Sequence, residues 1–352
     1  MTSPIDGTDD LVRRPIPGWL DKPLNRRLFL AGAAAGAATL GLTACGGNSA
    51  TPPAPTTTGS GSFPVTVVGK EGTATIPALP QRVVTLGFER DAETALALGV
   101  TPIAMSENSI YPNLIAPWTE AKLAGSKPEL LNTSEGFPFE KIVGLRPDVI
   151  LATDSTTLAD NYARLAQIAP TVSYIQGVEG DTWQQRTDLI GKVLGRSEQA
   201  QTVITETENK IKKVAQDNPT FAGKTVSFSV VASQEVYTVL GADNSGKFLK
   251  QLGLTISPKV TALPESANPG RAVVSLENLD VLDADVMIVT YLSSTDQTFL
   301  ESSPLFQQLN AVKNGAYIPL DFMVSVAMAY TSPLSIPYAL EGMAPAVAKA
   351  LA

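Results

Sequence analysis

Short apolar runs alternate with segments of helical periodicity along most of this chain of 352 residues. Strands that alternate with helices are typical of a largely parallel sheet covered by helices. After a hairpin at residues 65–76, strands are expected at 83–86, 102–105, 148–151, 171–174, 224–231, 236–240, 286–290 and 316–320. Helices are expected at 91–98, 140–144, 158–168, 244–252, 276–282 and 335–351. The pattern predicts an α/β fold with two Rossmann-like lobes.

One long segment between the two sets of elements has a different pattern. Residues 182–216 contain no proline, and their apolar positions recur at helical spacing. A continuous helix of this length would measure about 50 Å, enough to cross both lobes. Gly191 and Gly195 are the positions where its continuity is weakest. We expect an N-terminal lobe at residues 63–181, a connecting helix at 182–218 and a C-terminal lobe at 219–352.

The first 44 residues have the features of an export signal. A polar stretch leads to Arg26 and Arg27, and an apolar run rich in alanine and glycine follows at residues 28–44. This run is short and weakly hydrophobic for a membrane-spanning helix. The arginine pair before Leu-Phe-Leu resembles the twin-arginine motif, although a weak signal of this kind can also use the general secretory route.

The export segment ends in Leu-Thr-Ala-Cys, with the cysteine at position 45. This sequence resembles a bacterial lipobox, in which the cysteine thiol receives a diacylglyceryl group and becomes the first residue of the mature chain. Residues 46–62 are small and polar and indicate a flexible linker. We therefore expect lipidation at Cys45 and a protein anchored on the outer face of the cytoplasmic membrane. The alternatives are an ordinary signal peptide with a chance cysteine and an uncleaved anchor.

The composition excludes several classes of protein. The chain has no histidine and one cysteine, and its formal net charge is −8. The missing histidine removes the commonest ligand for zinc, copper and haem iron, and also the usual general base of hydrolases. The chain also lacks a glycine-rich phosphate loop and a basic stripe. We therefore expect no enzyme activity, no metal site or cofactor of its own, and no binding to nucleic acid.

Several short segments follow one another in a characteristic order. They are residues 82–87 with 93–100, Glu140–Ile150, Asp283–Val286, Leu305–Leu309 and Ser332–Ser335. Together they resemble the periplasmic binding proteins that supply ABC importers with ferric siderophores and vitamin B12. The resemblance implies a monomeric receptor that binds iron already chelated and delivers it to an ABC permease. It also implies small lobe movements on binding, because one long helix joins the lobes in this family.

The resemblance also implies a docking surface for the permease. In related proteins each lobe offers a glutamate to arginines of the permease, and the matching positions here are Glu140 and Glu277. Two separated carboxylates could fix the orientation of the complex and raise its association rate. The alternative is that each is an exposed acidic residue favoured by a helix dipole.

Candidate ligand contacts follow the carboxyl ends of the strands, where two-lobed α/β proteins bind ligands. Arg90 and Arg271, one in each lobe, could bind the oxygens of an anionic chelate through paired hydrogen bonds. The vitamin B12-binding relative has an aromatic contact near the position of Arg271, so an arginine there favours an anionic ligand. The alternative is that both are surface arginines paired with Glu89 and Glu265.

Four tyrosines are further candidates, because a flat face with a polar tip suits a bulky, partly apolar chelate. They are Tyr111, Tyr237, Tyr291 and Tyr330. Each could equally be a core or rim residue. Trp118 and Trp183 are interpreted as structural, and Trp183 as a residue that packs the lobes together.

The sequence therefore predicts a lipid-anchored receptor for a ferric siderophore. A haem or corrinoid receptor of the same fold is the nearest alternative, and haem would then require a tyrosine ligand. An exported enzyme and a membrane-tethered scaffold without its own permease are alternatives of a different class.

Overall fold

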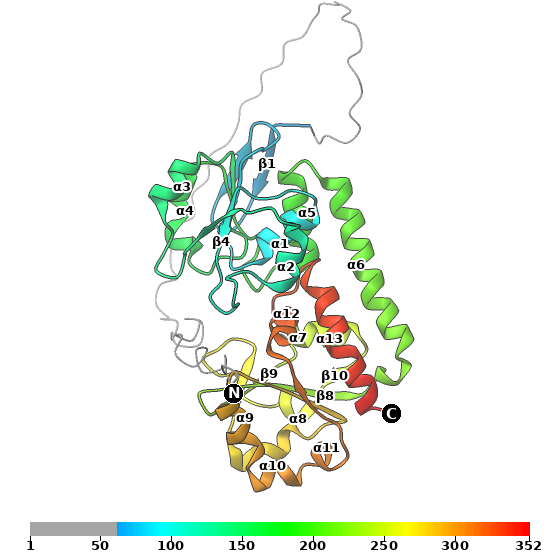
Figure 1. Cartoon of the computed structure of the whole chain (residues 1–352). Helices are drawn as coiled ribbons and strands as arrows, with labels where there is room; N and C mark the ends of the chain where they lie inside the picture. The colour runs from blue at the N-terminus through cyan, green and yellow to red at the C-terminus, as the bar shows by residue number, and fades with distance from the viewer. Residues whose placement is uncertain (1–61) are drawn as a thin grey trace, which may run out of the picture.

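The computed structural model describes residues 62–352, which form two α/β lobes (Figure 1). The predicted sites at Arg26, Arg27 and Cys45 lie outside the described residues. No helix within residues 62–352 is both long enough and apolar enough to cross a membrane. The two-lobed α/β architecture predicted from the alternation of strands and helices is confirmed.

The N-terminal lobe contains a parallel sheet of five strands in the order β5-β4-β3-β6-β7. Its strands are β3 (Val83–Thr85), β4 (Ala104–Ser106), β5 (Glu129–Leu131), β6 (Val149–Leu151) and β7 (Thr171–Val172). Its helices are α1 (Arg90–Ala97), α2 (Pro117–Leu123), α3 (Phe139–Leu145) and α4 (Leu158–Ala166), and the hairpin is β1 (Val65–Val68) with β2 (Thr73–Ile76). The central strands are entirely buried, as is usual for a parallel sheet covered on both faces.

The C-terminal lobe has a mixed sheet in the order β11-β9-β8-β12-β13, and β10 pairs with the start of β8. Its strands are β8 (Thr225–Ala232), β9 (Glu235–Val239), β10 (Thr255–Ile256), β11 (Arg271–Val274), β12 (Val286–Tyr291) and β13 (Tyr317–Leu320). Strands β8, β12 and β13 are parallel, whereas β9 runs antiparallel to both β8 and β11.

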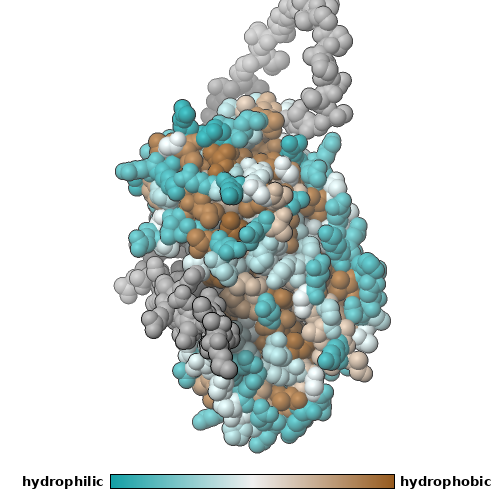
Figure 2. All heavy atoms as spheres, in the orientation of Figure 1, coloured by the Kyte–Doolittle hydropathy of each residue, from teal (hydrophilic) through white to brown (hydrophobic). Residues whose placement is uncertain are grey.

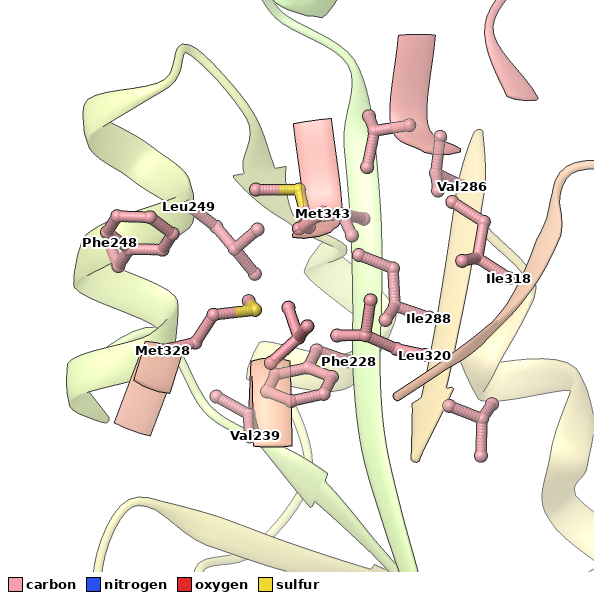
Figure 3. Close-up of a cluster of buried hydrophobic side chains, with 14 of the residues drawn as sticks. Phe228, Val239, Phe248, Leu249, Val286, Ile288, Ile318, Leu320, Met328 and Met343 are labelled. Carbon is pink, nitrogen blue, oxygen red and sulfur yellow. The ribbon is translucent and has the colours of Figure 1, made fainter. Parts of the chain in front are cut away.

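Helices cover both faces of the second sheet. The apolar face packs against α7 (Asn244–Gln251), α12 (Phe322–Ala329) and α13 (Ser335–Ala350), and Figure 3 shows Phe228, Ile288, Met328 and Met343 pointing toward one another there. The other elements are α8 (Pro258–Thr261), α9 (Ser294–Glu301), α10 (Pro304–Gln308), α11 (Asn310–Lys313) and the 3-10 helices η1 (Pro219–Phe221) and η2 (Leu276–Leu282).

The single helix expected at residues 182–218 is wrong: the segment forms α5 (Trp183–Val193) and α6 (Ser197–Asp217). Gly195 lies between them with φ 63°, a left-handed conformation that glycine adopts without a steric penalty. The Arg196 amide donates to the Gly191 carbonyl at 2.7 Å, and the Gly195 amide to the Lys192 carbonyl at 3.2 Å. This is the Schellman pattern that ends a helix.

Helix α6 alone therefore connects the lobes, and with 21 residues it is about 31 Å long. Val203 packs in a core cluster of the N-terminal lobe, and Ile211 packs in the core of the C-terminal lobe. The outer edge formed by this helix is mostly hydrophilic (Figure 2). The helix is thus anchored in both cores, which restricts how far the lobes can rotate.

Aromatic side chains of the N-terminal lobe extend the core of the C-terminal lobe. Tyr111, Trp118 and Trp183 all belong to the same buried cluster as the second sheet. The Trp118 ring lies 4.9 Å from that of Tyr338 in α13. The interpretation of Trp183 as a residue that packs the lobes together agrees with this position.

Candidate functional site: the cleft between the lobes

A small cavity of about 50 Å³ lies between the lobes. The N-terminal lobe contributes Phe88 and Ile110, which follow β3 and β4. The C-terminal lobe contributes Phe228, Val230, Ser245, Arg271, Leu292, Phe322, Ser325, Val326, Ala329 and Tyr330. The Phe88 ring lies 4.6 Å from the Tyr330 ring, so the lobes are in contact here. Pockets for small molecules usually measure a few hundred Å³, so this cavity is too small for a bulky ligand without some rearrangement.

The strand register shows which predicted residues face the cleft. Val230 lines the cavity, and its partner in β9 is Tyr237. Arg271 of β11 is opposite Val239, two residues further along the same face of the sheet. Because directly paired residues lie on the same side of a sheet, Tyr237 and Arg271 both belong to the cleft face.

The expectation that Tyr291 faces the cleft is wrong. Tyr291 pairs with Val231, which neighbours Val230 along the strand and therefore points to the opposite face. Its hydroxyl is 2.7 Å from that of Tyr317, which in turn donates to Glu301 at 2.6 Å. The sequence placed Tyr291 correctly at the end of a strand, but its side chain lies on the face of the sheet opposite the cleft.

Arg90 begins α1 and is buried, with 1% of its side chain exposed. Its Nε donates to Oδ1 of Asp154 at 2.6 Å, and Oδ2 of Asp154 accepts from the Glu89 and Arg90 amides at 3.0 and 2.9 Å. Burial opposes ionisation of Asp154, but Arg90 and Arg186 together hold its pKa below the ordinary value. Arg90 is therefore fixed as a cation at the floor of the cleft.

Further charged groups are buried around this pair. The Tyr111 hydroxyl donates to Glu89 at 2.5 Å, and the Trp118 indole donates to Glu93. Burial raises the pKa of Glu89 well above its ordinary value and raises the pKa of Glu93 to about 7. Tyr111 is only 1% exposed, so it supports the floor of the cleft and does not line the cavity.

Both arginines form ion pairs beside the cleft. Arg90 pairs with Asp154 and, at 3.0 Å, with Glu179, whereas Arg271 lies 3.6 Å from Asp243. The alternative that Arg90 is a surface arginine paired with Glu89 is therefore wrong. The Arg90 guanidinium also lies 5.4 Å from the centre of the Tyr330 ring. The structure thus gathers Arg90, Arg271 and Tyr330 around one cleft.

The two candidate docking residues lie at the surface of different lobes. Glu140 is in the first turn of α3, and Glu277 is in the first turn of η2. Both side chains are exposed, and neither forms an ion pair or hydrogen bond within residues 62–352. These positions are accessible to a partner protein.

The sequence did not indicate Phe88, Asp154, Glu179 or the other buried charges of α1. A run of Glu-Arg-Asp at a helix start reads as an exposed turn. The available signal was its position directly after the first strand of a parallel sheet, where ligand sites concentrate. Within the part of the chain that the structure describes, no three Asp, Glu or Cys side chains form a group suited to a metal ion.

The model of a family described as periplasmic binding protein matches residues 84–323. The chain belongs to this family. This periplasmic binding protein is 28% identical over 313 residues to the iron(3+)-hydroxamate-binding protein FhuD of Bacillus subtilis, covering 85% of this chain and 91% of FhuD. It is 26% identical over 266 residues to the Fe(3+) dicitrate-binding protein FecB of Escherichia coli, covering 74% and 84% of the two chains.

A solved structure supports the same assignment. PiaA of Streptococcus pneumoniae in complex with ferrichrome is 27% identical, with a TM-score of 0.68 over 81% of this chain and 98% of PiaA. The match therefore extends over most of this periplasmic binding protein.

Proposed function

We propose that this periplasmic binding protein captures a ferric siderophore in the cleft between its lobes and delivers it to an ABC importer. The observation that carries the proposal is the cleft itself, which combines an apolar lining with the polar groups of Arg271 and Tyr330. The binding of iron hydroxamate and iron dicitrate by relatives that match most of the chain supports this ligand class.

The charges around the cleft favour a ligand with anionic oxygens. Arg90 and Arg271 come from different lobes. Each guanidinium can attract carboxylate, hydroxamate or catecholate oxygens by its charge and can donate paired hydrogen bonds to them. The Tyr237 and Tyr330 rings offer flat surfaces to the organic part of a chelate. A bulky chelate requires the cavity to widen, because it measures only about 50 Å³.

The same proposal assigns roles to residues outside the cleft. Exposed Glu140 and Glu277 dock to arginines of the permease, one from each lobe. Lipidation at Cys45 holds the receptor on the outer face of the membrane, which raises its effective concentration near the permease. The pair Arg26 and Arg27 directs export before the lipid is attached.

Tryptophan fluorescence provides the test, because Trp118 and Trp183 lie where the lobes meet. The purified full-length chain is titrated with ferrichrome, ferric dicitrate, haem and cobalamin. Saturable quenching by a ferric chelate at micromolar concentration is expected. Quenching by haem or cobalamin alone would replace the siderophore proposal with the haem or corrinoid alternative.

A transport assay tests docking separately. Charge reversal by Glu140→Lys together with Glu277→Lys should abolish uptake of the bound chelate, while the affinity of the purified receptor is retained. Uptake at the original rate would remove these residues from the docking surface.

A further inference from the structure

The carboxylate of Glu179 bridges the two lobes across the cleft. Its Oε1 accepts a hydrogen bond from Nη2 of Arg90 at 3.0 Å in the N-terminal lobe. Its Oε2 accepts one from Nδ2 of Asn244, the first residue of α7 in the C-terminal lobe, at 2.5 Å. Glu179 lies in the turn between Gly177 and Gly180 that follows β7, so its backbone belongs to neither sheet.

The two sides of the Arg90–Glu179 pair differ greatly in exposure. The Arg90 side chain is 1% exposed and also bound to Asp154, whereas 62% of the Glu179 side chain is exposed. Arg90 therefore keeps its position and charge when Glu179 leaves. When Glu179 leaves, its exposed carboxylate is hydrated by solvent, and Asp154 remains as the partner of the Arg90 charge.

Glu179 presents to Arg90 the chemical group that an anionic chelate would present. Carboxylate and catecholate oxygens both accept charge-assisted hydrogen bonds from a guanidinium. The Tyr330 ring, which lines the cavity, lies 5.4 Å from the same guanidinium, so Arg90 is separated from the ligand space by a single side chain.

We infer that Glu179 is a specificity-determining residue that occupies the place of a ligand oxygen on Arg90 and is displaced when an anionic chelate binds. The inference rests on the proposed function, because it assumes that the ligand enters this cleft. Displacement also breaks the bond to Asn244, which removes one of the contacts between the lobes as the ligand enters. A ligand without an anionic oxygen gains nothing from this exchange, and the cleft then favours anionic chelates.

Two substitutions at one position separate direct displacement from general charge repulsion. Glu179→Gln removes the negative charge, whereas Glu179→Asp keeps it but shortens the side chain by one methylene. The shorter side chain cannot reach Arg90 and Asn244 together. Glu135→Gln is the matched control, because Glu135 is an exposed N-terminal-lobe glutamate outside the cleft lining.

The ligand-bound measurement uses ferric dicitrate as the anionic probe and ferrichrome as the neutral one. Both Glu179 variants should bind ferric dicitrate about threefold to fivefold more tightly, with a smaller change for ferrichrome and none for the control. Unchanged affinity in both variants would overturn the inference. Tighter binding in Glu179→Gln alone would also overturn it, because charge removal would then explain the effect.

A second measurement needs no ligand. Glu179→Ala and Asn244→Ala each remove the bond between the lobes, so amide hydrogen exchange in residues 86–92 and 328–332 should accelerate several-fold. Exchange at the original rate in both variants would refute the bridge. The original protein could bind none of the chelates while exchange in the variants accelerates. In that case the proposed function and the role of Glu179 in specificity are both refuted, but the bridge between the lobes is confirmed.

Discussion

Replacing Glu93 by glutamine should make the protein more stable at alkaline pH and leave its stability at acid pH nearly unchanged. Glu93 is fully buried in α1, where the Trp118 indole and the Thr119 hydroxyl donate to one carboxylate oxygen. Burial raises the pKa of this carboxyl from 4.5 to about 7. Glutamine keeps the shape and the acceptor oxygen but cannot ionise.

The sign of the effect follows from proton binding. Between pH 4.5 and about 7 the folded protein retains a proton on Glu93 that the unfolded chain releases. The stabilisation is complete below this window and is lost as the pH rises through 7. A rise from 4.5 to about 7, at about 1.4 kcal/mol per pKa unit, corresponds to about 3 kcal/mol. Glu89, whose pKa is also raised by burial, adds to the loss in the original protein.

Urea unfolding at pH 5 and pH 8 measures this difference. The free energies of unfolding of Glu93→Gln and of the original protein should be similar at pH 5. At pH 8 the variant should be more stable by about 2–3 kcal/mol. Glu135→Gln, at an exposed glutamate, controls for the loss of one acidic residue. Equal stabilities of Glu93→Gln and the original protein at both pH values would refute the reasoning.

Three further substitutions test other parts of the structure by urea unfolding. Asp154→Ala leaves Arg90 buried without its main partner and should destabilise the protein by about 3–5 kcal/mol; a loss below 1 kcal/mol would contradict the buried pair. Gly195→Ala places a Cβ at φ 63° and should cost about 1–2 kcal/mol, whereas a more stable variant would contradict the helix break. Tyr291→Phe loses the hydroxyl contact to Tyr317, about 1 kcal/mol, and fluorescence titration should show unchanged chelate affinity; weaker binding would return Tyr291 to the cleft.

The alternation of strands and helices was predictable because both lobes contain buried parallel strands. The apolar runs at residues 83–86, 148–151 and 286–290 coincide with β3, β6 and β12 within one or two residues. Strand β5 was not predicted, because its three residues, Glu-Leu-Leu, are too few to show a strand pattern. In the structure they range from exposed to buried along the strand. Helix α12 was missed because its eight residues are nearly all apolar and show no periodicity.

The break between α5 and α6 was visible in the sequence only as a weakness. Gly195 can continue a helix or end it, and the apolar spacing continues on both sides. In the structure Gly191 packs so closely on Ala200 that a Cβ at Gly191 would lie 2.5 Å from the Ala200 Cβ. The two helices thus fold back on each other, and tertiary packing selects the left-handed conformation at Gly195.

By itself, the sequence determined the α/β class, the repetition of the pattern in two lobes and the absence of histidine chemistry. These follow from local periodicity and composition, which can be read directly from the order of the residues along the chain. Only the tertiary structure decided that Arg90 is buried with Asp154, that Tyr291 points away from the cleft, and that Glu179 joins the lobes. Each of these depends on segments that are distant along the chain, and a pattern of neighbouring residues cannot specify which distant charges meet or which face of a sheet they share.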